Sequence, residues 1–409
     1  MNSRPSIVII GAGLQGVSVA LALAERGVAT TVLERREAPM RGASHGNEGK
    51  IHLGLVYALD PTLATGIEML RGAHTFGPLL DRWCGPLPWS TMVTEGFRYA
   101  VMPDSLAQPD QLEHYYERLK ASLGDALDAL PVAPGHLGGD IDWLWKRAGD
   151  AHCSPRVDGV PVPCFDTQEI AVDTSLLGAR LAEHLRARPE IELLGDTRVE
   201  RARRVGDRFE LDVAHGGARR TIAADGVINC AWYERGRLDA MVDRQEPRAP
   251  TSYRVKHRVI VKPGSGAGPF RPVTMVQGPY GDLSLFRDGS VYLSWYPECR
   301  TYFDRLPPAD ELLQPEVLDA IATMTLGKMT NIFPALAEAR ILSCSPCVII
   351  AAGTRDVDDP ASELHRRSTS GPSGGDGWWS VDTGKLTLAP LHGESTARLV
   401  LQEFGLDAG

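Results

Sequence analysis

A glycine-rich loop near the beginning of the sequence constrains the fold more than any other feature. Residues 11–16 have the pattern GxGxxG and follow the apolar, β-branched run at residues 7–10. Small and apolar residues recur at helical spacing after the loop, which predicts a helix. In such a unit Gly11 permits a tight turn, Gly13 lets the backbone approach a pyrophosphate, and Gly16 lets the helix pack closely on the strand. The sequence therefore predicts a strand, a turn and a helix that bind the phosphates of a dinucleotide at the helix N-terminus.

An acidic residue ends the second expected strand, at residues 30–34. The carboxylate of Glu34 is placed to accept hydrogen bonds from the ribose hydroxyls of an adenosine. Leu14, Gln15 and Arg35 adjoin the loop and this acid, and we expect them to contact the same cofactor. Because an acid at this position serves FAD and NAD equally, the motif alone leaves both cofactors open.

Length and composition limit the classes of protein to consider. A chain of 409 residues is too long for one compact core and predicts two domains. The formal net charge of −9 disfavours binding to a nucleic-acid backbone. No apolar run reaches the roughly 18 residues that a membrane span needs, so we expect no span. The apolar run at the start of the chain is too short for a signal peptide.

Seven cysteines are scattered along the chain at irregular spacing. An odd number of unpatterned cysteines is typical of reduced thiols, which predicts a cytoplasmic protein. Cys344 and Cys347 form a single CxxC pair without a second pair or nearby histidines, so we expect no metal site.

The stretch after the second strand distinguishes the two cofactors through a resemblance. Residues 5–60 resemble the FAD-dependent D-amino-acid oxidase superfamily, which includes glycine and sarcosine oxidases, glycerol-3-phosphate dehydrogenase and L-2-hydroxyglutarate dehydrogenase. Lys50-Ile51-His52-x-Gly54-x-x-Tyr57 is closest to the hydroxy-acid and glycerophosphate members, whereas Ser44-His45-Gly46 resembles the sarcosine oxidase branch. The resemblance implies FAD as the cofactor. It also implies cofactor contacts from Ser44, His45, Gly46, Asn47 and Lys50.

Three later segments extend the resemblance over most of the FAD domain. Residues 168–173 match the link into the second FAD segment, and residues 224–231 match the strand that returns to the cofactor. Residues 381–387, before a C-terminal helix, match the closing flavin motif. The family usually has glycine where this chain has Trp232. The further cofactor contacts that we expect are Val199, Cys230, Ala231, Trp232, Gly384, Lys385, Leu386 and Thr387.

These patterns predict an α/β fold in which a Rossmann-like FAD-binding domain is interleaved with a mixed α+β, antiparallel-sheet substrate domain. Residues 254–261 and 290–297 alternate in polarity, unlike the continuously apolar first strand. We assign to the FAD-binding domain residues 1–93, 151–240 and 335–409. We assign to the substrate domain residues 94–150 and 241–334.

His52, Lys256 and Arg355 are the candidates for catalysis. A histidine has a suitable pKa to take the hydroxyl proton of an alcohol while hydride moves to flavin N5, whereas a neutral amine needs no strong base. Lys256 shares one face of a strand with Arg254 and Arg258. These three cations either face solvent or bind a substrate anion. Arg355 precedes the closing motif, where the resemblance implies an arginine that anchors the substrate.

Four other side chains admit two interpretations each. Lys385, with the helix N-terminus after it, either stabilises negative charge on the reduced flavin or is a solvated lysine at a plain helix start. Tyr292 and Tyr296 either wall the substrate pocket or pack in the core. Cys347 lies near the position where sarcosine oxidases attach flavin through sulfur. It is either a covalent attachment site or an inert buried thiol.

The sequence thus predicts an FAD-dependent oxidoreductase that oxidises a C–N bond of a small polar amine or amino acid by hydride transfer to flavin N5. Its partners would be a small polar or anionic substrate and oxygen or another electron acceptor. The alternatives are a dehydrogenase of a hydroxy acid or other polar alcohol, a flavin monooxygenase, and a non-catalytic flavin-binding protein. Gly375-Asp376 is followed by Gly377-Trp378 and not by a helix of small residues, which disfavours a monooxygenase.

Overall fold

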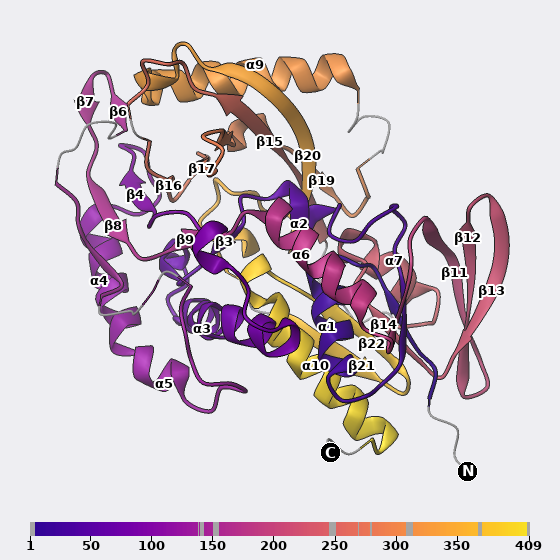
Figure 1. The fold of residues 1–409 in the computed structure, drawn as a ribbon. Coiled ribbons are helices and arrows are strands. Elements are labelled where there is room, and N and C mark those ends of the chain that lie inside the picture. The colour runs from indigo at the N-terminus through magenta and orange to yellow at the C-terminus, as the bar shows by residue number, and fades with distance from the viewer. Residues whose placement is uncertain are drawn as a thin grey trace.

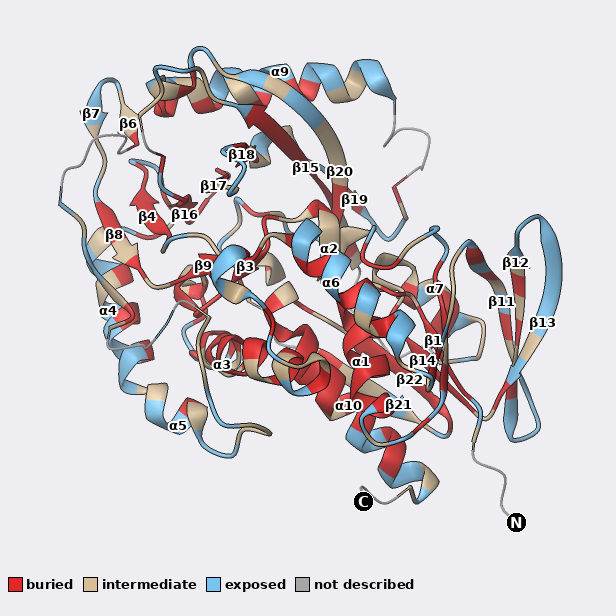
Figure 2. Ribbon diagram, in the orientation of Figure 1, coloured by how far each residue is buried: buried red, intermediate tan, exposed pale blue. Residues whose placement is uncertain are grey.

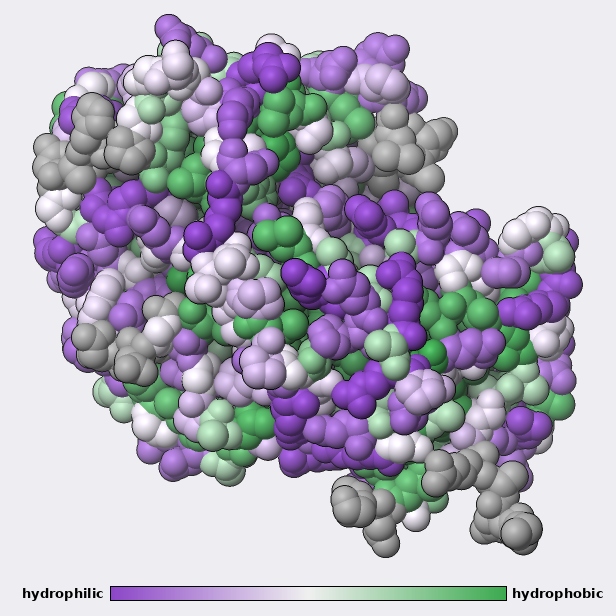
Figure 3. Space-filling view, viewed as in Figure 1, coloured by the Kyte–Doolittle hydropathy of each residue, from purple (hydrophilic) through white to green (hydrophobic). Residues whose placement is uncertain are grey.

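The frame of the molecule is formed by two large sheets and the helices that cover them (Figure 1). The computed structural model describes residues 5–137, 139, 143–149, 155–244, 251–268, 270–278, 280–307, 314–366 and 370–406. Within these ranges, no helix has both the length and the hydropathy needed to cross a membrane. The face of the molecule in Figure 3 carries hydrophilic residues over much of its area, with hydrophobic residues in smaller areas between them.

The first sheet is built around the N-terminal strand. The order of its described strands is β10-β2-β1-β14-β22-β21, and all neighbours are parallel except β21 and β22. All four residues of β1 are buried, as expected of a parallel strand that is covered on both faces. The bounds are β1 Ile7–Ile10, β2 Thr30–Leu33, β10 Ile191–Leu194, β14 Gly226–Asn229, β21 Gly371–Gly375 and β22 Trp378–Asp382.

Helix α1 (Leu14–Ala24) follows the glycine loop, and all of its residues are buried. Gly13 precedes it in an extended conformation and offers no side-chain cap, which leaves the first N–H groups of the helix without side-chain acceptors from the cap. The chain leaves the helix at Gly27, which has a φ of +67°. Helices α3 (Ala64–Cys84) and α10 (Ala389–Phe404) pack with α1, and all three are largely buried (Figure 2).

The second sheet is mostly antiparallel. Its described strands follow the order β19-β15-β18-β17-β16-β4-β8-β5, and β20 pairs with the other edge of β15. Helix α9 (Pro315–Ile332) packs on the long β15–β20 pair at the top of Figure 1. The bounds are β4 Arg98–Val101, β5 Trp145–Arg147, β8 Cys164–Thr167, β15 Thr251–Lys262, β16 Val273–Val276, β17 Asp282–Leu285, β18 Val291–Leu293, β19 Arg300–Phe303 and β20 Arg340–Ala352.

Smaller elements connect and flank the two sheets. The three-stranded sheet β11-β12-β13 projects to the right of Figure 1, and its strand β13 is largely exposed (Figure 2). Their bounds are β11 Thr197–Val205, β12 Arg208–His215, β13 Ala218–Ala224, β3 Lys50–Ile51, β9 Ile170–Ala171, β6 Arg156–Val157, β7 Val160–Pro161, α2 Ala43–Gly46, α4 Pro109–Ala121, α5 Leu123–Leu127, α6 Thr174–Ala187 and α7 Arg235–Ala240.

The expected fold class is confirmed, because a parallel sheet of Rossmann type is interleaved along the chain with a largely antiparallel sheet. Two strands lie differently from the assigned domain ranges. β8 and β20 fall in ranges assigned to the FAD-binding domain, yet both join the second sheet. β20 does so because it pairs with β15 from Thr251 to Lys262, a register that the local sequence of either strand does not reveal.

Candidate active site

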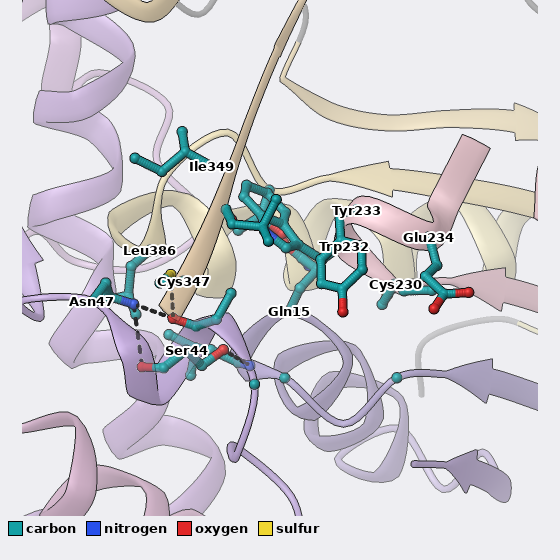
Figure 4. Close-up of a pocket in the computed structure, with 18 of the residues that line it drawn as sticks. Gln15, Ser44, Asn47, Cys230, Trp232, Tyr233, Glu234, Cys347, Ile349 and Leu386 are labelled. Carbon is teal, nitrogen blue, oxygen red and sulfur yellow. Dashed lines mark hydrogen bonds between the residues drawn. The ribbon is translucent and has the colours of Figure 1, made fainter. Parts of the chain in front are cut away.

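A cavity of about 210 Å³ is lined by residues of both sheets and of the loops beside them. Figure 4 shows Ser44 and Asn47 from the α2 segment, Cys347 and Ile349 from β20, and the segment after β14 around it. Eighteen of the residues expected from the sequence line it: Gly11, Gly13, Leu14, Gln15, Glu34, Arg35, Ser44, Asn47, Lys50, His52, Val199, Cys230, Ala231, Trp232, Lys256, Gly384, Lys385 and Leu386.

The glycine loop at one end of the cavity has no room for side chains. Gly11 has a φ of +96°, and a Cβ there would lie 2.8 Å from the carbonyl oxygen of Cys230. A Cβ on Gly16 would lie 1.9 Å from the carbonyl oxygen of Gly11. Gly16 is absent from the cavity lining, and its role is the close packing of α1 on the loop.

Glu34 ties this loop to the end of β2. Its carboxylate accepts hydrogen bonds from the backbone N–H of Ala12 at 2.8 Å and of Arg36 at 2.9 Å. Each carboxylate oxygen keeps further lone pairs, so Glu34 can also accept from a ribose hydroxyl. The N–H of Leu14 donates to Ser44 Oγ at 2.9 Å, which joins the α2 segment to the start of α1.

Gln15 gives a direct test of whether these residues fit a polar cofactor. Its side chain is only 4% exposed and lines the cavity. Neither its amide oxygen nor its amide nitrogen has a hydrogen-bond partner among the described residues. A buried amide without partners is costly, whereas a bound phosphate or sugar would supply them. This orphaned donor and acceptor, beside a cradle of glycine backbone, fit a dinucleotide cofactor.

Trp232 follows β14 at the position where the resembled family usually has glycine. Its φ is +50°, in the left-handed region that favours glycine. The indole Nε1 donates a hydrogen bond to the carbonyl oxygen of Val348 at 2.7 Å. Trp232 therefore lines the cavity and connects the end of β14 to strand β20 of the second sheet.

The closing motif packs on the segment that contains His52. Thr387 Oγ1 accepts from the backbone N–H of His52 at 2.9 Å and donates to the carbonyl oxygen of Lys50 at 3.2 Å. Thr387 is fully buried and does not line the cavity, so its observed role is to hold β3 against the start of α10. Lys385 and Leu386, just before it, do line the cavity.

Four buried charged side chains meet where the cavity reaches the second sheet. Lys256 Nζ lies 2.8 Å from Glu48 Oε2 and 3.6 Å from Asp282 Oδ2. Lys50 Nζ lies 2.8 Å from Asp282 Oδ1, donates to Thr274 Oγ1, and sits 4.4 Å from the centre of the Phe97 ring. We call Glu48, Lys50, Lys256 and Asp282 the charge quartet; two cations and two anions balance within it.

Three of the quartet residues, Glu48, Lys256 and Asp282, are held in their charged forms by their neighbours. Burial opposes ionisation of Glu48, but Lys256 and Lys50 outweigh it and hold the pKa of Glu48 at about 2. Burial likewise opposes the charge on Asp282, and the same two lysines keep its pKa well below its ordinary value. Burial opposes the charge on Lys256 too, yet Glu48 and the neighbouring tyrosines and Asp282 raise its pKa well above its ordinary value.

Of the two alternatives for the cationic face of β15, the structure contradicts the solvated one. Arg254, Lys256 and Arg258 on β15 are all buried. Arg254 bonds to Asp356 and donates to the carbonyl oxygen of Tyr296 at 2.6 Å. Arg258 Nη1 lies 2.9 Å from His45 Nε2 and donates to the His45 carbonyl oxygen at 3.1 Å. Each of the three cations therefore has a partner within the protein, and Lys256 also lines the cavity.

His45, Gly46 and Arg355 lie outside the cavity lining found among the described residues. His45 points to Arg258, and burial lowers its pKa. Gly46 packs on Cys347, to which a Cβ would come within 3.1 Å. The side chain of Arg355 is 59% exposed and lies 3.5 Å from Asp359. Its loop follows Gly353, whose φ of +92° turns the chain after β20, so nearness to the closing motif in sequence does not bring it to the cavity.

His52 lines the cavity beside a carboxylate that the sequence did not single out. Its Nδ1 is buried and lies 3.3 Å from Glu169 Oε1. Burial lowers the pKa of His52 in spite of Glu169, so the imidazole is neutral at neutral pH. Tyr296 also lines the cavity, whereas Tyr292 is fully buried near Lys256.

Cys347 lines the cavity, and its Sγ lies 3.8 Å from the carbonyl oxygen of Ala43. Burial raises the pKa of this thiol to about 12, which disfavours the reactive thiolate. Among the described residues, no group of three or more potential metal ligands is found.

Glu48, Glu169 and Asp282 belong to this end of the cavity but were not among the site residues expected from the sequence. Glu48 lies in the glycine-rich stretch between Asn47 and Lys50, two expected cofactor contacts. That position was the feature of the sequence that could have indicated it. Glu169 lies in residues 168–173, which match the link into the second FAD segment, and that match was its signal. Asp282 carries no such signal, because its partner Lys50 is distant in sequence.

Solved structures with the same fold cover nearly the whole chain. Glycine oxidase from Geobacillus kaustophilus superposes with a TM-score of 0.66 at 14% identity, covering 98% of this chain and 95% of that one. L-proline dehydrogenase from P. horikoshii gives 0.64 at 15% identity, with 98% and 94% coverage. L-alpha-glycerophosphate oxidase from Mycoplasma pneumoniae, solved with FAD bound, gives 0.66 at 14% identity, with 97% and 95% coverage.

Curated relatives match over parts of the chain. The tRNA 5-methylaminomethyl-2-thiouridine biosynthesis bifunctional protein MnmC of Chromohalobacter salexigens is 36% identical over 138 residues, which is 31% of this chain and 20% of that protein. MnmC of Marinobacter nauticus is 25% identical over 244 residues, or 59% of this chain and 33% of that protein. The matches thus span at most a third of these two relatives. The family described as FAD dependent oxidoreductase (DAO) matches residues 6–399, and the chain belongs to this family.

Proposed function

We propose that the protein oxidises the C–N bond of a small polar amine or amino acid. The observation that carries this proposal is the combination of a neutral His52 and an ionised Glu48 in the lining of one cavity. A carboxylate attracts an ammonium group, and a neutral imidazole can take the proton that must leave before the amine is oxidised. The names of similar proteins support the same class, since glycine oxidase and L-proline dehydrogenase act on amino acids.

FAD, when bound, supplies the hydride acceptor, flavin N5. Residues 11–16 and the start of α1 would hold its pyrophosphate, with Gln15 as a further donor and acceptor. Glu34 would accept from the ribose of the adenosine. The ring end would lie towards His52, Lys385 and Leu386, where Lys385 and the start of α10 provide positive potential.

Oxidation of a polar alcohol is the second candidate, and the pairing of His52 with Glu169 favours it. An alcohol needs a base for its hydroxyl proton, and a carboxylate beside the imidazole stabilises the protonated form that results. The similarity to a glycerophosphate oxidase supports this alternative at the level of fold.

The structure argues against the monooxygenase alternative, whose motif places a Gly-Asp pair directly before a helix of small residues. Gly375 ends β21, and Asp376 and Gly377 form the turn into the antiparallel strand β22. The Gly-Asp pair therefore does not begin a helix. A non-catalytic protein is excluded by membership of a family of oxidoreductases.

The electron acceptor and the cellular location are further parts of the proposal. We infer oxygen or another acceptor as the oxidant and a small polar or anionic molecule as the substrate. Cysteines 84, 164, 230, 299, 344 and 347 are free, and Cys153 lies outside the described residues. Free thiols support the cytoplasmic location that the sequence predicts.

Anaerobic mixing of the purified holoenzyme with a substrate panel tests the proposed function. Glycine, sarcosine, L-proline and iminodiacetate represent amines, and glycerol 3-phosphate and L-2-hydroxyglutarate represent alcohols. We expect an amine to bleach the flavin absorbance at about 450 nm. Bleaching by the alcohols alone would contradict amine oxidation and favour the second candidate. Acid precipitation of the same sample, with yellow colour in the supernatant, would show that Cys347 does not bind the flavin covalently.

A further inference from the structure

Glu169 is a fully buried carboxylate outside the cavity lining. The antiparallel pairing of β3 and β9 places Ile51 opposite Ile170, and this register brings Glu169 beside His52. Its Oε2 accepts from the backbone N–H of Leu53 at 2.8 Å, and its Oε1 accepts from the Tyr99 hydroxyl. Both oxygens are therefore fixed in place, and Oε1 is the one that faces His52 Nδ1 at 3.3 Å.

The charge states of the pair follow from its surroundings. Burial raises the pKa of Glu169, but His52, Lys50 and the Tyr99 hydroxyl outweigh it and lower that pKa below its ordinary value. Burial lowers the pKa of His52, with Lys385 and Lys50 acting in the same direction and Glu169 opposing them. The ring of Tyr57 packs edge-on against the imidazole. At neutral pH the pair is thus an ionised carboxylate beside a neutral imidazole.

A neutral imidazole carries one N–H, and its position decides which nitrogen is basic. The buried Nδ1 has no well-aligned hydrogen bond among the described residues, and Glu169 Oε1 lies at ion-pairing distance from it. A proton on Nδ1 faces the carboxylate, whereas a lone pair there would face a negative charge. The first arrangement is favoured, because a small ring rotation converts the contact into a charge-assisted hydrogen bond.

We propose that Glu169 is a positioning residue that holds the Nδ1–H tautomer of His52 and so presents the Nε2 lone pair to the substrate end of the cavity. This inference rests on the proposed function, in which His52 takes a proton from the substrate. Glu169 itself does not line the cavity. It acts through His52 alone, as a buried carboxylate does when it orients a catalytic imidazole.

The Glu169→Gln variant separates positioning from packing. The Leu53 N–H requires an oxygen at the Oε2 position, so the glutamine amide would turn its NH₂ group towards His52 Nδ1 and Tyr99. An NH₂ group donates to a lone pair on Nδ1. The variant should therefore switch His52 to the Nε2–H tautomer while keeping the size of the side chain.

The test is ¹⁵N NMR of the FAD-loaded protein labelled only in histidine. Signals of His52 are assigned from their loss in His52→Asn, and the two neutral tautomers differ in their nitrogen shifts. We expect Nδ1–H in the wild type and Nε2–H in Glu169→Gln. The matched control is Glu68→Gln, which removes a carboxylate 3.7 Å from His392 on α10 and should leave the His52 signals unchanged.

Either of two results would overturn the inference. One is an Nε2–H tautomer of His52 in the wild type, and the other is an Nδ1–H tautomer that persists in Glu169→Gln. With a substrate from the panel, the variant should reduce its flavin about 10²–10⁴-fold more slowly at pH 7, with little change in the substrate Kd, because a general base contributes a factor of that order. Failure of every panel compound to bleach the wild-type flavin would count against the proposed function alone, since the tautomer is measured without substrate.

Discussion

The two ends of the cavity are built in different ways. The end next to α1 consists mainly of backbone: Gly11 and Gly13, the first N–H groups of a helix, and Glu34 at the end of the neighbouring strand. The end next to the second sheet consists of side chains that meet from distant positions. Glu48 and Lys256 are 208 residues apart in sequence, and Lys50 and Asp282 are 232 residues apart.

This difference determines what a substitution can change at each end. A backbone site depends on a few positions where any side chain would collide, so it tolerates little variation there. A site of paired side chains depends on charge balance, so the change of one member leaves a buried partner unmatched. The first end is thus suited to a fixed cofactor, and the second end is where chemistry and substrate preference can vary on the same frame.

The largest effect is expected from breaking the charge quartet. Lys256→Met leaves Glu48 without its closest partner, and the loss of one member of a buried ion pair costs about 3–5 kcal/mol. The free energy of unfolding, measured by urea denaturation at pH 7, should fall by that amount. The double variant Lys256→Met with Glu48→Gln is the control, and it should recover most of the loss because Asp282 keeps Lys50. A loss within the range of an exposed ion pair, below about 1 kcal/mol, would contradict this account.

The pH dependence of the same variant sharpens the test. The folded protein holds the pKa of Glu48 at about 2, below its ordinary value of 4.5. A lowered folded pKa stabilises the protein fully above 4.5, and the stabilisation is lost as the pH falls through about 2. Without Lys256 the carboxyl group of Glu48 protonates more readily. In acid the variant therefore buries a neutral group, and the loss in its free energy of unfolding becomes smaller. The difference in stability between wild type and variant should therefore shrink from pH 7 to pH 3, and a constant difference would contradict it.

The contrast also explains how far the sequence could predict the site. The strand, the glycine loop and Glu34 are contiguous, so the pattern of residues contains the geometry that it predicts. The burial of the β15 cations could not be predicted, because their partners Glu48, Asp356 and His45 are far away in the chain. The pairing of β20 with β15 is equally non-local. It places β20 in the second sheet, although its residues were assigned to the FAD-binding domain.

Gly16→Ala is expected to break the cofactor end. Its Cβ would lie 1.9 Å from the Gly11 carbonyl oxygen, so the loop must shift away from α1. We expect the free energy of unfolding to fall by about 1–3 kcal/mol, as for other overpacked sites. The variant should also lose FAD on gel filtration, as measured by the ratio of flavin to protein absorbance.

Gly327→Ala in α9 is the matched control for that variant. No heavy atom lies within 4 Å of the added Cβ, and alanine favours a helix. Stability should rise by about 0.5–1 kcal/mol with the FAD content unchanged. Retention of both FAD and stability in Gly16→Ala would mean that the loop can relax, and that the backbone end is less constrained than the quartet end.

The smallest effect is expected from Arg355→Ala. This variant tests whether the end of the cavity next to the second sheet extends to the loop that contains Arg355. Arg355 is exposed beside Asp359, so its loss should change the free energy of unfolding by less than about 0.5 kcal/mol. The Kd of a panel substrate and the rate of flavin reduction should both stay at the wild-type values. Arg254→Ala, which removes the buried arginine bound to Asp356 of the same loop, is the comparison and should cost stability. Tenfold weaker substrate binding by Arg355→Ala would show that residues 353–366 contact the substrate. The side-chain end of the cavity would then extend to an exposed loop, and a cation outside the charge quartet would hold the substrate anion.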